Sequence, residues 1–246
     1  MKNKYYNSIF NFRFILFTFF VVTIFISFYL DEDSSGGAKQ DHLVTKEFII
    51  LFSQNFFSSI EIYDPRSNPH LPFFYILLGK LSNFINLEVL RFLHLLICLS
   101  LPLIFYKILK LRFKYQNRDV LFLISTLIFL SPYYRSSAIW LTNDNLTLIF
   151  FSLSVYYFFK TEKFKNDNLA DSIKCFLFLI FTVYLRQNFF LFFIFYFYYL
   201  FINSKVKNVQ LIIFLSLIFA LPGLLYLFYF QHIQFYLKAG IVNNRD

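Results

Sequence analysis

The chain carries little charge for its length. Charged residues make up 15% of its 246 residues, whereas hydrophobic residues make up 58%. A soluble domain has about a quarter charged residues, so the surplus of apolar residues here is best explained as lipid-facing surface. We therefore predict an all-α protein that forms one integral membrane domain.

The chain is also poor in cysteine, since Cys98 and Cys175 are its two cysteines. Both lie within apolar segments, which excludes a disulfide framework and a cysteine metal site. The net charge of +9 does not indicate nucleic acid as a partner, because the basic residues lie between apolar runs and not on one soluble face. The membrane is the expected partner instead.

Apolar runs long enough to cross a bilayer, at about 17–25 residues each, recur along the whole chain. For the first run, the alternative is a cleaved signal peptide with small residues at 34–38 as its processing site. The apolar runs that follow favour a retained helix. We predict seven spans, at residues 14–30, 88–106, 119–134, 143–159, 172–186, 188–203 and 209–230.

The distribution of basic residues predicts the orientation of these spans. A further run at 70–85 contains Lys80, and we expect it to lie along the interface as an amphipathic helix. The basic stretches 107–118 and 160–174 then fall in the cytoplasm with the N-terminus, as the positive-inside rule requires. The expected parts are an N-terminal tail and first helix at 1–30, an exoplasmic loop with an interfacial helix at 31–86, a six-helix bundle at 87–230 and an exoplasmic tail at 231–246.

Acidic residues concentrate in the exoplasmic loop. Seven of the fourteen fall between residues 31 and 68, and Asp31, Glu32 and Asp33 directly follow the first helix. One interpretation is a general base at the mouth of a cavity, where partial desolvation raises the pKa of a carboxylate. The alternative is a charged stop that fixes the depth of the helix.

A second carboxylate, Asp144, lies at the expected exoplasmic start of the span at 143–159. It can simply complement the dipole of that helix in its first turn. A pair of carboxylates on one membrane face can also orient an acceptor hydroxyl together, so Asp144 joins the candidate catalytic residues.

Candidate anion-binding residues lie on the same expected face. Asn68-Pro69-His70 predicts a capped helix start, whose free N–H groups suit a phosphate oxygen, with His70 as a further donor. Arg186 stands beside Gln187 in an otherwise apolar run, and arginines at such depths tend to pair or to bind anions. Arg135 and Lys80 are further candidates, although Arg135 also fits a side chain that reaches the headgroups and Lys80 an interfacial anchor.

Taken together, these motifs resemble those of the GT-C superfamily of membrane glycosyltransferases, which use polyprenyl-phosphate-linked sugars. Asp31-Glu32-Asp33 is similar to the acidic motif after the family's first helix. The segment at 68–75 is similar to a His/Lys-Pro-Pro-Leu-Tyr-Tyr segment, with its second proline displaced to Pro72. Thr142-Asn143-Asp144 looks like the family's second acidic position. Arg186-Gln187 resembles a pair in the dolichyl-phosphate-glucose glucosyltransferase branch, and protein mannosyltransferases belong to the same superfamily.

The resemblance implies an inverting hexosyltransferase that acts in glycosylation at the cell envelope. Its donor would be a polyprenyl-phosphate-linked sugar, and its acceptor a lipid, a glycan or a protein. No cofactor is required by the resemblance, and a divalent metal is compatible with it. We expect a multi-pass protein of the bacterial cytoplasmic membrane, or of the endoplasmic reticulum in a eukaryote.

Two alternatives remain at this stage. The same arginines would serve a protein that binds or transports a lipid-linked sugar without needing a base. Family members usually continue with further helices or a soluble domain, so a truncated, non-catalytic fragment of such an enzyme is the other alternative.

Overall fold

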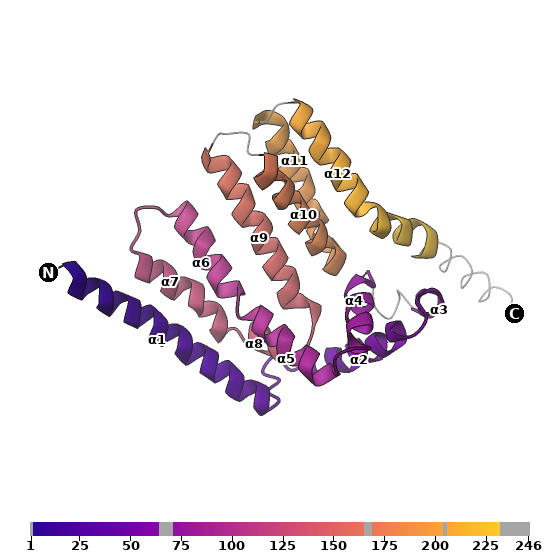
Figure 1. Cartoon of the computed structure of the whole chain (residues 1–246), viewed down its shortest axis with the longest axis horizontal. Helices are drawn as coiled ribbons and strands as arrows, with labels where there is room; N and C mark the ends of the chain where they lie inside the picture. The colour runs from indigo at the N-terminus through magenta and orange to yellow at the C-terminus, as the bar shows by residue number, and fades with distance from the viewer. Residues whose placement is uncertain (1, 64–70, 165–168, 204–205, 232–246) are drawn as a thin grey trace, which may run out of the picture.

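The computed structural model describes residues 2–63, 71–164, 169–203 and 206–231, and this part of the chain contains helices and no strand. The helices lie side by side in a bundle, with shorter helices gathered at one end (Figure 1). In chain order the elements are α1 Lys2–Tyr29, α2 Ala38–Ser53, α3 Phe56–Ile62, α4 Phe73–Ser82, α5 Leu87–Cys98, α6 Leu101–Arg112, α7 Arg118–Thr126, η1 Leu127–Leu130, α8 Pro132–Ile139, α9 Asn143–Phe164, α10 Leu169–Leu185, η2 Gln187–Phe190, α11 Leu191–Asn203, α12 Val206–Leu225 and η3 Tyr226–Gln231.

Three helical segments are long and apolar enough to cross a membrane, and they cover Phe12–Tyr29, Leu87–Arg112 and Asn208–Phe228. This finding agrees with the prediction of a helical, membrane-associated protein. The second segment consists of α5 and α6, which are separated by Leu99 and Ser100. Pro102 lies in the first turn of α6, where its missing N–H is tolerated.

Other predicted spans differ in detail from the helices that form. The range 119–134 divides into α7, η1 and the start of α8. Pro132 begins α8, and the Ser131 hydroxyl accepts a hydrogen bond from the N–H of Tyr134 at 3.4 Å. The range 188–203 begins with the 3₁₀ turn η2 before α11 continues. In the first of these ranges, a proline and a side-chain cap interrupt the apolar run.

The bundle core is built from aromatic and aliphatic side chains. Phe17 and Phe20 of α1 pack against Phe129 of η1, with ring centroids 5.8 and 5.4 Å apart. About one turn before Phe17, the Arg13 side chain donates to the Asp119 carboxylate of α7 at 2.5 Å. The outward faces of α1, α11 and α12 keep large apolar residues exposed, which is the distribution expected of a surface that meets lipid.

The α2–α4 unit lies at the end of the bundle where α1 ends and α9 begins (Figure 1). Its helices α2 and α4 cross closely at Gly79 of α4. A Cβ atom added there would lie 2.7 Å from the backbone carbon of Phe52 and 2.9 Å from the carbonyl oxygen of Ile49. Gly79 is therefore required by contact between two backbones.

Replacement of Gly79 by alanine is expected to lower the free energy of unfolding by about 1–3 kcal/mol, because the methyl group forces the two helices apart. Thermal unfolding of the purified protein in detergent measures the change. Gly37→Ala is the matched control, since no atom lies within 4 Å of a Cβ at that position. Equal stability of the two variants would contradict the close crossing of α2 and α4.

Candidate functional site

The candidate site begins at the end of α1, where the chain turns sharply. The N–H of Glu32 donates to the carbonyl of Ser27 at 3.0 Å, and the N–H of Asp31 donates to that of Phe28 at 3.3 Å. This is the hydrogen-bond pattern of a Schellman motif, in which the residue after the helix adopts a left-handed conformation. Asp31 has that conformation, with φ of 51°, and aspartate tolerates it better than most residues. The turn directs the acidic run back over the end of the bundle.

Asp31 is paired with Arg91 of α5. The guanidinium donates to the Asp31 carboxylate at 2.5 Å and, through Nε, to the carbonyl oxygen of Ile139 at 2.8 Å. It also stacks on the rings of Trp140 and Phe28, at 4.2 and 4.6 Å from their centroids. The Arg91 side chain is 7% exposed whereas that of Asp31 is 54% exposed. Arg91 thus joins the end of α1, the start of α5 and the segment before α9 from within.

Glu32 forms a second pair, with Arg135 of α8, at 2.7 Å. Arg135 also donates to the Ser27 hydroxyl, and the Trp140 indole N–H donates to the backbone oxygen of Glu32 at 2.8 Å. Partial burial opposes ionisation of Glu32, but hydrogen bonds from Arg135 and Ser27 prevail and lower its pKa below the ordinary value. A carboxylate held in this way is a poor proton acceptor at neutral pH.

Asp144 and Arg186 form a third pair, which joins the start of α9 to the end of α10. Asp144 lies in the first turn of α9, where the helix dipole favours a negative charge. The Asn143 side chain donates to the carbonyl oxygen of Leu185 at 3.0 Å and so fixes the start of α9 against the end of α10. The Asp144 and Arg186 side chains are 42% and 33% exposed, and both can therefore reach a ligand.

Helix α2 brings a further carboxylate to this end of the bundle. The Asp33 side chain accepts a hydrogen bond from the N–H of Ala38 at 3.2 Å, which satisfies the start of α2. Asp41 follows in the first turn and is exposed. Desolvation by partial burial raises the pKa of Asp41, and the negative charge of Asp144 adds to the rise, while Arg186 opposes it.

The neighbouring His42 is buried and stacks beside Trp140, with ring centroids 5.6 Å apart. Its Nδ1 has no hydrogen-bond partner within the described part of the chain. Burial lowers the pKa of His42, and the positive charge of Arg91 lowers it further. The imidazole is therefore neutral at pH 7.

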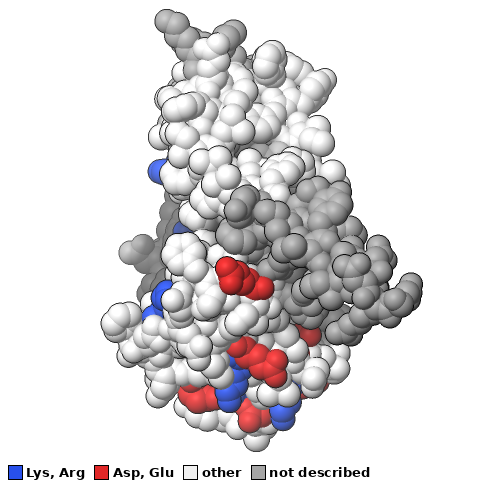
Figure 2. All heavy atoms as spheres, turned by 90° about the vertical axis from the view of Figure 1, so that its right-hand side faces the viewer, with Lys and Arg blue, Asp and Glu red and all other residues white. Residues whose placement is uncertain are grey.

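Charged side chains are unevenly distributed over the surface. On the face shown in Figure 2, acidic and basic residues gather over the lower part of the molecule, whereas the upper part is almost free of charge. The three arginine–carboxylate pairs lie at one end of the bundle, which we call the polar end, and Asp41 belongs to the helix that begins there.

The structure brings some of the predicted site residues together and separates others. Asp31, Glu32, Asp144, Arg135 and Arg186 all lie at the polar end, and Gln187 follows Arg186 at the start of η2.

Arg135 is directed inward to Ser27 and Glu32, and its Nε is buried without a partner within the described residues, so this side chain stabilises the junction of α1 and α8. Lys80 donates to the carbonyl oxygen of Gln54, at the far end of α2 from the Asp33 cap. The 16 residues of α2 measure about 24 Å at 1.5 Å per residue, so Lys80 is remote from that cap. His70 lies outside the described residues.

Three residues of the polar end were missed by the sequence analysis. Arg91 carried a usable signal, because an arginine inside a predicted span demands a partner. Asp41 and His42 carried none, since a carboxylate and an imidazole on a surface helix are ordinary.

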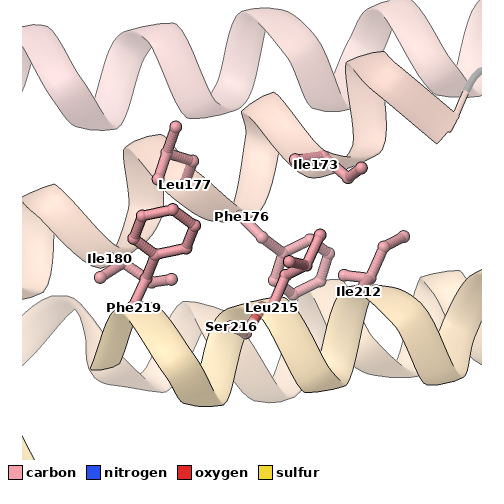
Figure 3. Close-up of a pocket in the computed structure, with 8 residues that line it drawn as sticks. All are labelled: Ile173, Phe176, Leu177, Ile180, Ile212, Leu215, Ser216 and Phe219. Carbon is pink, nitrogen blue, oxygen red and sulfur yellow. The ribbon is translucent and has the colours of Figure 1, made fainter. Parts of the chain in front are cut away.

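A shallow apolar groove lies between α10 and α12, away from the polar end. Figure 3 shows the side chains that line it, with Ser216 as the one polar residue among them. It offers no group for acid–base chemistry or for phosphate binding. Within the described ranges, no three His, Cys, Asp or Glu side chains gather closely enough to hold a metal ion.

No protein-family model matches the chain, and comparisons with the curated proteins and with the solved structures find no match either.

Replacing Arg91 by lysine keeps the positive charge but loses the planar donors that reach Ile139 and Asp31 together. We expect the free energy of unfolding to fall by about 1–3 kcal/mol, the cost of leaving a buried polar group unpaired. Thermal or denaturant unfolding in detergent measures it. Arg118→Lys, at an exposed position, is the control and should leave stability unchanged. If both variants unfold alike, Arg91 does not hold the polar end together.

Proposed function

We propose that the chain is a multi-pass membrane glycosyltransferase that moves a sugar from a polyprenyl-phosphate donor to an acceptor hydroxyl, with inversion at the sugar carbon. The observation that carries this proposal is the partly exposed Asp144–Arg186 pair, which places a cation and a carboxylate together at the polar end of the bundle. Sugar transfer from a lipid phosphate needs both charges, at the border of the apolar phase that holds the lipid.

In this proposal the bundle crosses the membrane seven times, with the polar end on the exoplasmic side. Helix α4 has 10 residues, or about 15 Å, which is too short for a hydrocarbon core of about 30 Å. The end of α6, the start of α7 and the end of α9 lie at the opposite end of the bundle (Figure 1). Basic residues at these connections favour a cytoplasmic location for them.

A topology reporter tests this arrangement. Fused after Lys114, between α6 and α7, it should be cytoplasmic, because the positive-inside rule retains that basic connection. A second fusion after Asn55, between α2 and α3, should be exoplasmic and serves as the control. An exoplasmic reporter at Lys114 would mean that the 70–85 segment crosses the membrane.

The proposed reaction forms one bond and breaks one. The acceptor oxygen attacks C1 of the sugar while the bond from C1 to the phosphate oxygen breaks, and the polyprenyl phosphate departs with the bonding electrons. Arg186, Gln187 and His70 would stabilise the growing negative charge on the phosphate. Asp144 would orient the acceptor, and the proton would go to Asp31 or Glu32, of which Asp31 is the more exposed.

Donor turnover tests the function directly. The purified protein in liposomes should release polyprenyl phosphate from a polyprenyl-phosphate hexose in the presence of an acceptor. Arg186→Gln should lower kcat/KM by about 10- to 100-fold, since a charge-assisted contact contributes about 1.5–3 kcal/mol. The control Arg118→Gln, exposed at the opposite end of the bundle, should act like the wild type.

Two outcomes would replace the proposal. Donor binding without turnover by the wild-type protein would favour a lipid-linked-sugar binding or transport protein. Binding of neither donor nor acceptor would favour a non-catalytic fragment.

A further inference from the structure

We propose that α12 contains a hinge at residues 219–223, latched by the Tyr184 hydroxyl, which opens the bundle beside the Asp144–Arg186 pair to a lipid chain from the membrane. The inference rests on the proposed function for the identity of that lipid, a polyprenyl phosphate. It adds the route by which the lipid reaches the pair and the residue that controls this route.

Helix α12 is weakened within its membrane-spanning part. The segment Asn208–Phe228 is long and apolar enough to cross a membrane, and Pro222 lies inside the helix there. A proline has no N–H to donate to the carbonyl four residues earlier, and its ring crowds that carbonyl. From Tyr226 the chain continues as the π-helix η3, a rare form that often marks functional sites. The helix can therefore change direction at a defined place.

The Tyr184 side chain of α10 is inserted at the same place. Its hydroxyl accepts the N–H of Gly223 at 3.0 Å and donates to the carbonyl oxygen of Phe219 at 2.7 Å. These two backbone groups are four residues apart, and in an uninterrupted α-helix they bond to each other. A side chain that enters the hydrogen-bond ladder in this way kinks a helix. Gly223 is required here, because a Cβ atom would lie 2.8 Å from Cε1 of Tyr184.

The hydroxyl gives α12 two arrangements that both satisfy its backbone. With Tyr184 inserted, Gly223 and Phe219 bond to the hydroxyl, and with Tyr184 withdrawn they can bond to each other. Hydrocarbon offers no water to an unpaired backbone group, so both groups need a partner in either arrangement. Tyr184 is the last residue but one of α10, and its withdrawn hydroxyl can reach water or headgroups at the polar end.

The segment after the hinge packs beneath the Asp144–Arg186 pair. Tyr226 is buried in one hydrophobic cluster with Leu141 and Leu185. Leu141 precedes the start of α9 and Leu185 ends α10, and these two helix ends carry the pair. A change of direction at the hinge therefore displaces Tyr226 from the cluster below the pair.

The opening that results faces lipid. Tyr184 stacks on Phe73 of α4, with ring centroids 5.1 Å apart, and so lies between α4 and α12. On the outer side of α12, Leu217, Leu221 and Leu225 recur every four residues and are each more than half exposed. An opening between two apolar helices within a membrane admits a hydrocarbon chain and not a water-soluble substrate. A polyprenyl chain that enters here brings its phosphate to Arg186.

Spin labels in liposomes measure the hinge. Leu77→Cys on α4 and Phe228→Cys in η3 carry the labels, because both side chains are exposed whereas the native cysteines are buried. Tyr184→Phe removes the hydroxyl and keeps the ring. The 77–228 distance should then increase by about 3 Å or more, the displacement that a change of about 20° gives to an arm of about 7.5 Å.

Two controls accompany this measurement. Tyr198→Phe removes the hydroxyl of an exposed tyrosine on α11 and should leave the 77–228 distance unchanged. A second label pair, at Leu77 and Leu211, lies on α4 and on α12 before the hinge. Its distance should be the same in Tyr184→Phe and in the wild type, which shows that the bundle remains folded.

Polyprenyl phosphate serves as the probe for the lipid. Added to the liposomes, it should increase the 77–228 distance of the wild-type protein. Inorganic phosphate has the charged group without the chain and should leave the distance unchanged. In Tyr184→Phe, polyprenyl phosphate should add little to the increase, because the latch is already released.

The outcomes separate this inference from the function on which it rests. An unchanged 77–228 distance in Tyr184→Phe would overturn the latch. An unchanged distance with polyprenyl phosphate, or an equal increase with inorganic phosphate, would overturn the lipid route, and either result leaves sugar transfer intact. Wild-type protein that opens with polyprenyl phosphate but does not turn over the sugar donor would overturn sugar transfer and keep the hinge.

Discussion

The polar end depends on a single buried cation, Arg91. Its guanidinium lies between the rings of Trp140 and Phe28, and it donates to the Ile139 carbonyl and the Asp31 carboxylate. A charge at this depth is costly unless its donors are satisfied, so the surrounding segments are constrained to the positions that satisfy them. The turn after α1, the start of α5 and the approach to α9 are placed by this one side chain.

The other two arginine–carboxylate pairs near Arg91 differ in where their side chains point and in how exposed they are. Arg135 and Glu32 face inward and close the contact between α1 and α8. Asp144 and Arg186 remain partly exposed at the polar end, where α9 begins and α10 ends. The side chains of Arg135 and Glu32 are 22% and 29% exposed, and those of Arg186 and Asp144 are 33% and 42% exposed. The more exposed pair exchanges partners with a ligand more readily.

Some of the site residues could be anticipated from their positions in the sequence. Asp31, Glu32, Asp144 and Arg186 stand at the ends of apolar runs, and polar residues in such positions meet at one membrane face whatever the details of packing. The remoteness of Lys80 could not be anticipated, since it follows from the crossing of α2 and α4 at Gly79.

The sequence by itself determined a helical, membrane-associated chain with its acidic residues clustered after the first helix, because hydrophobic content and the spacing of charge are local properties. Only the tertiary structure decided which arginine meets which carboxylate, since each pair joins segments far apart in sequence. It also decided that the range 119–134 divides into α7, η1 and the start of α8. The physical reason is that burial and ion pairing depend on distances in space, and the spacing of residues along the chain does not give those distances.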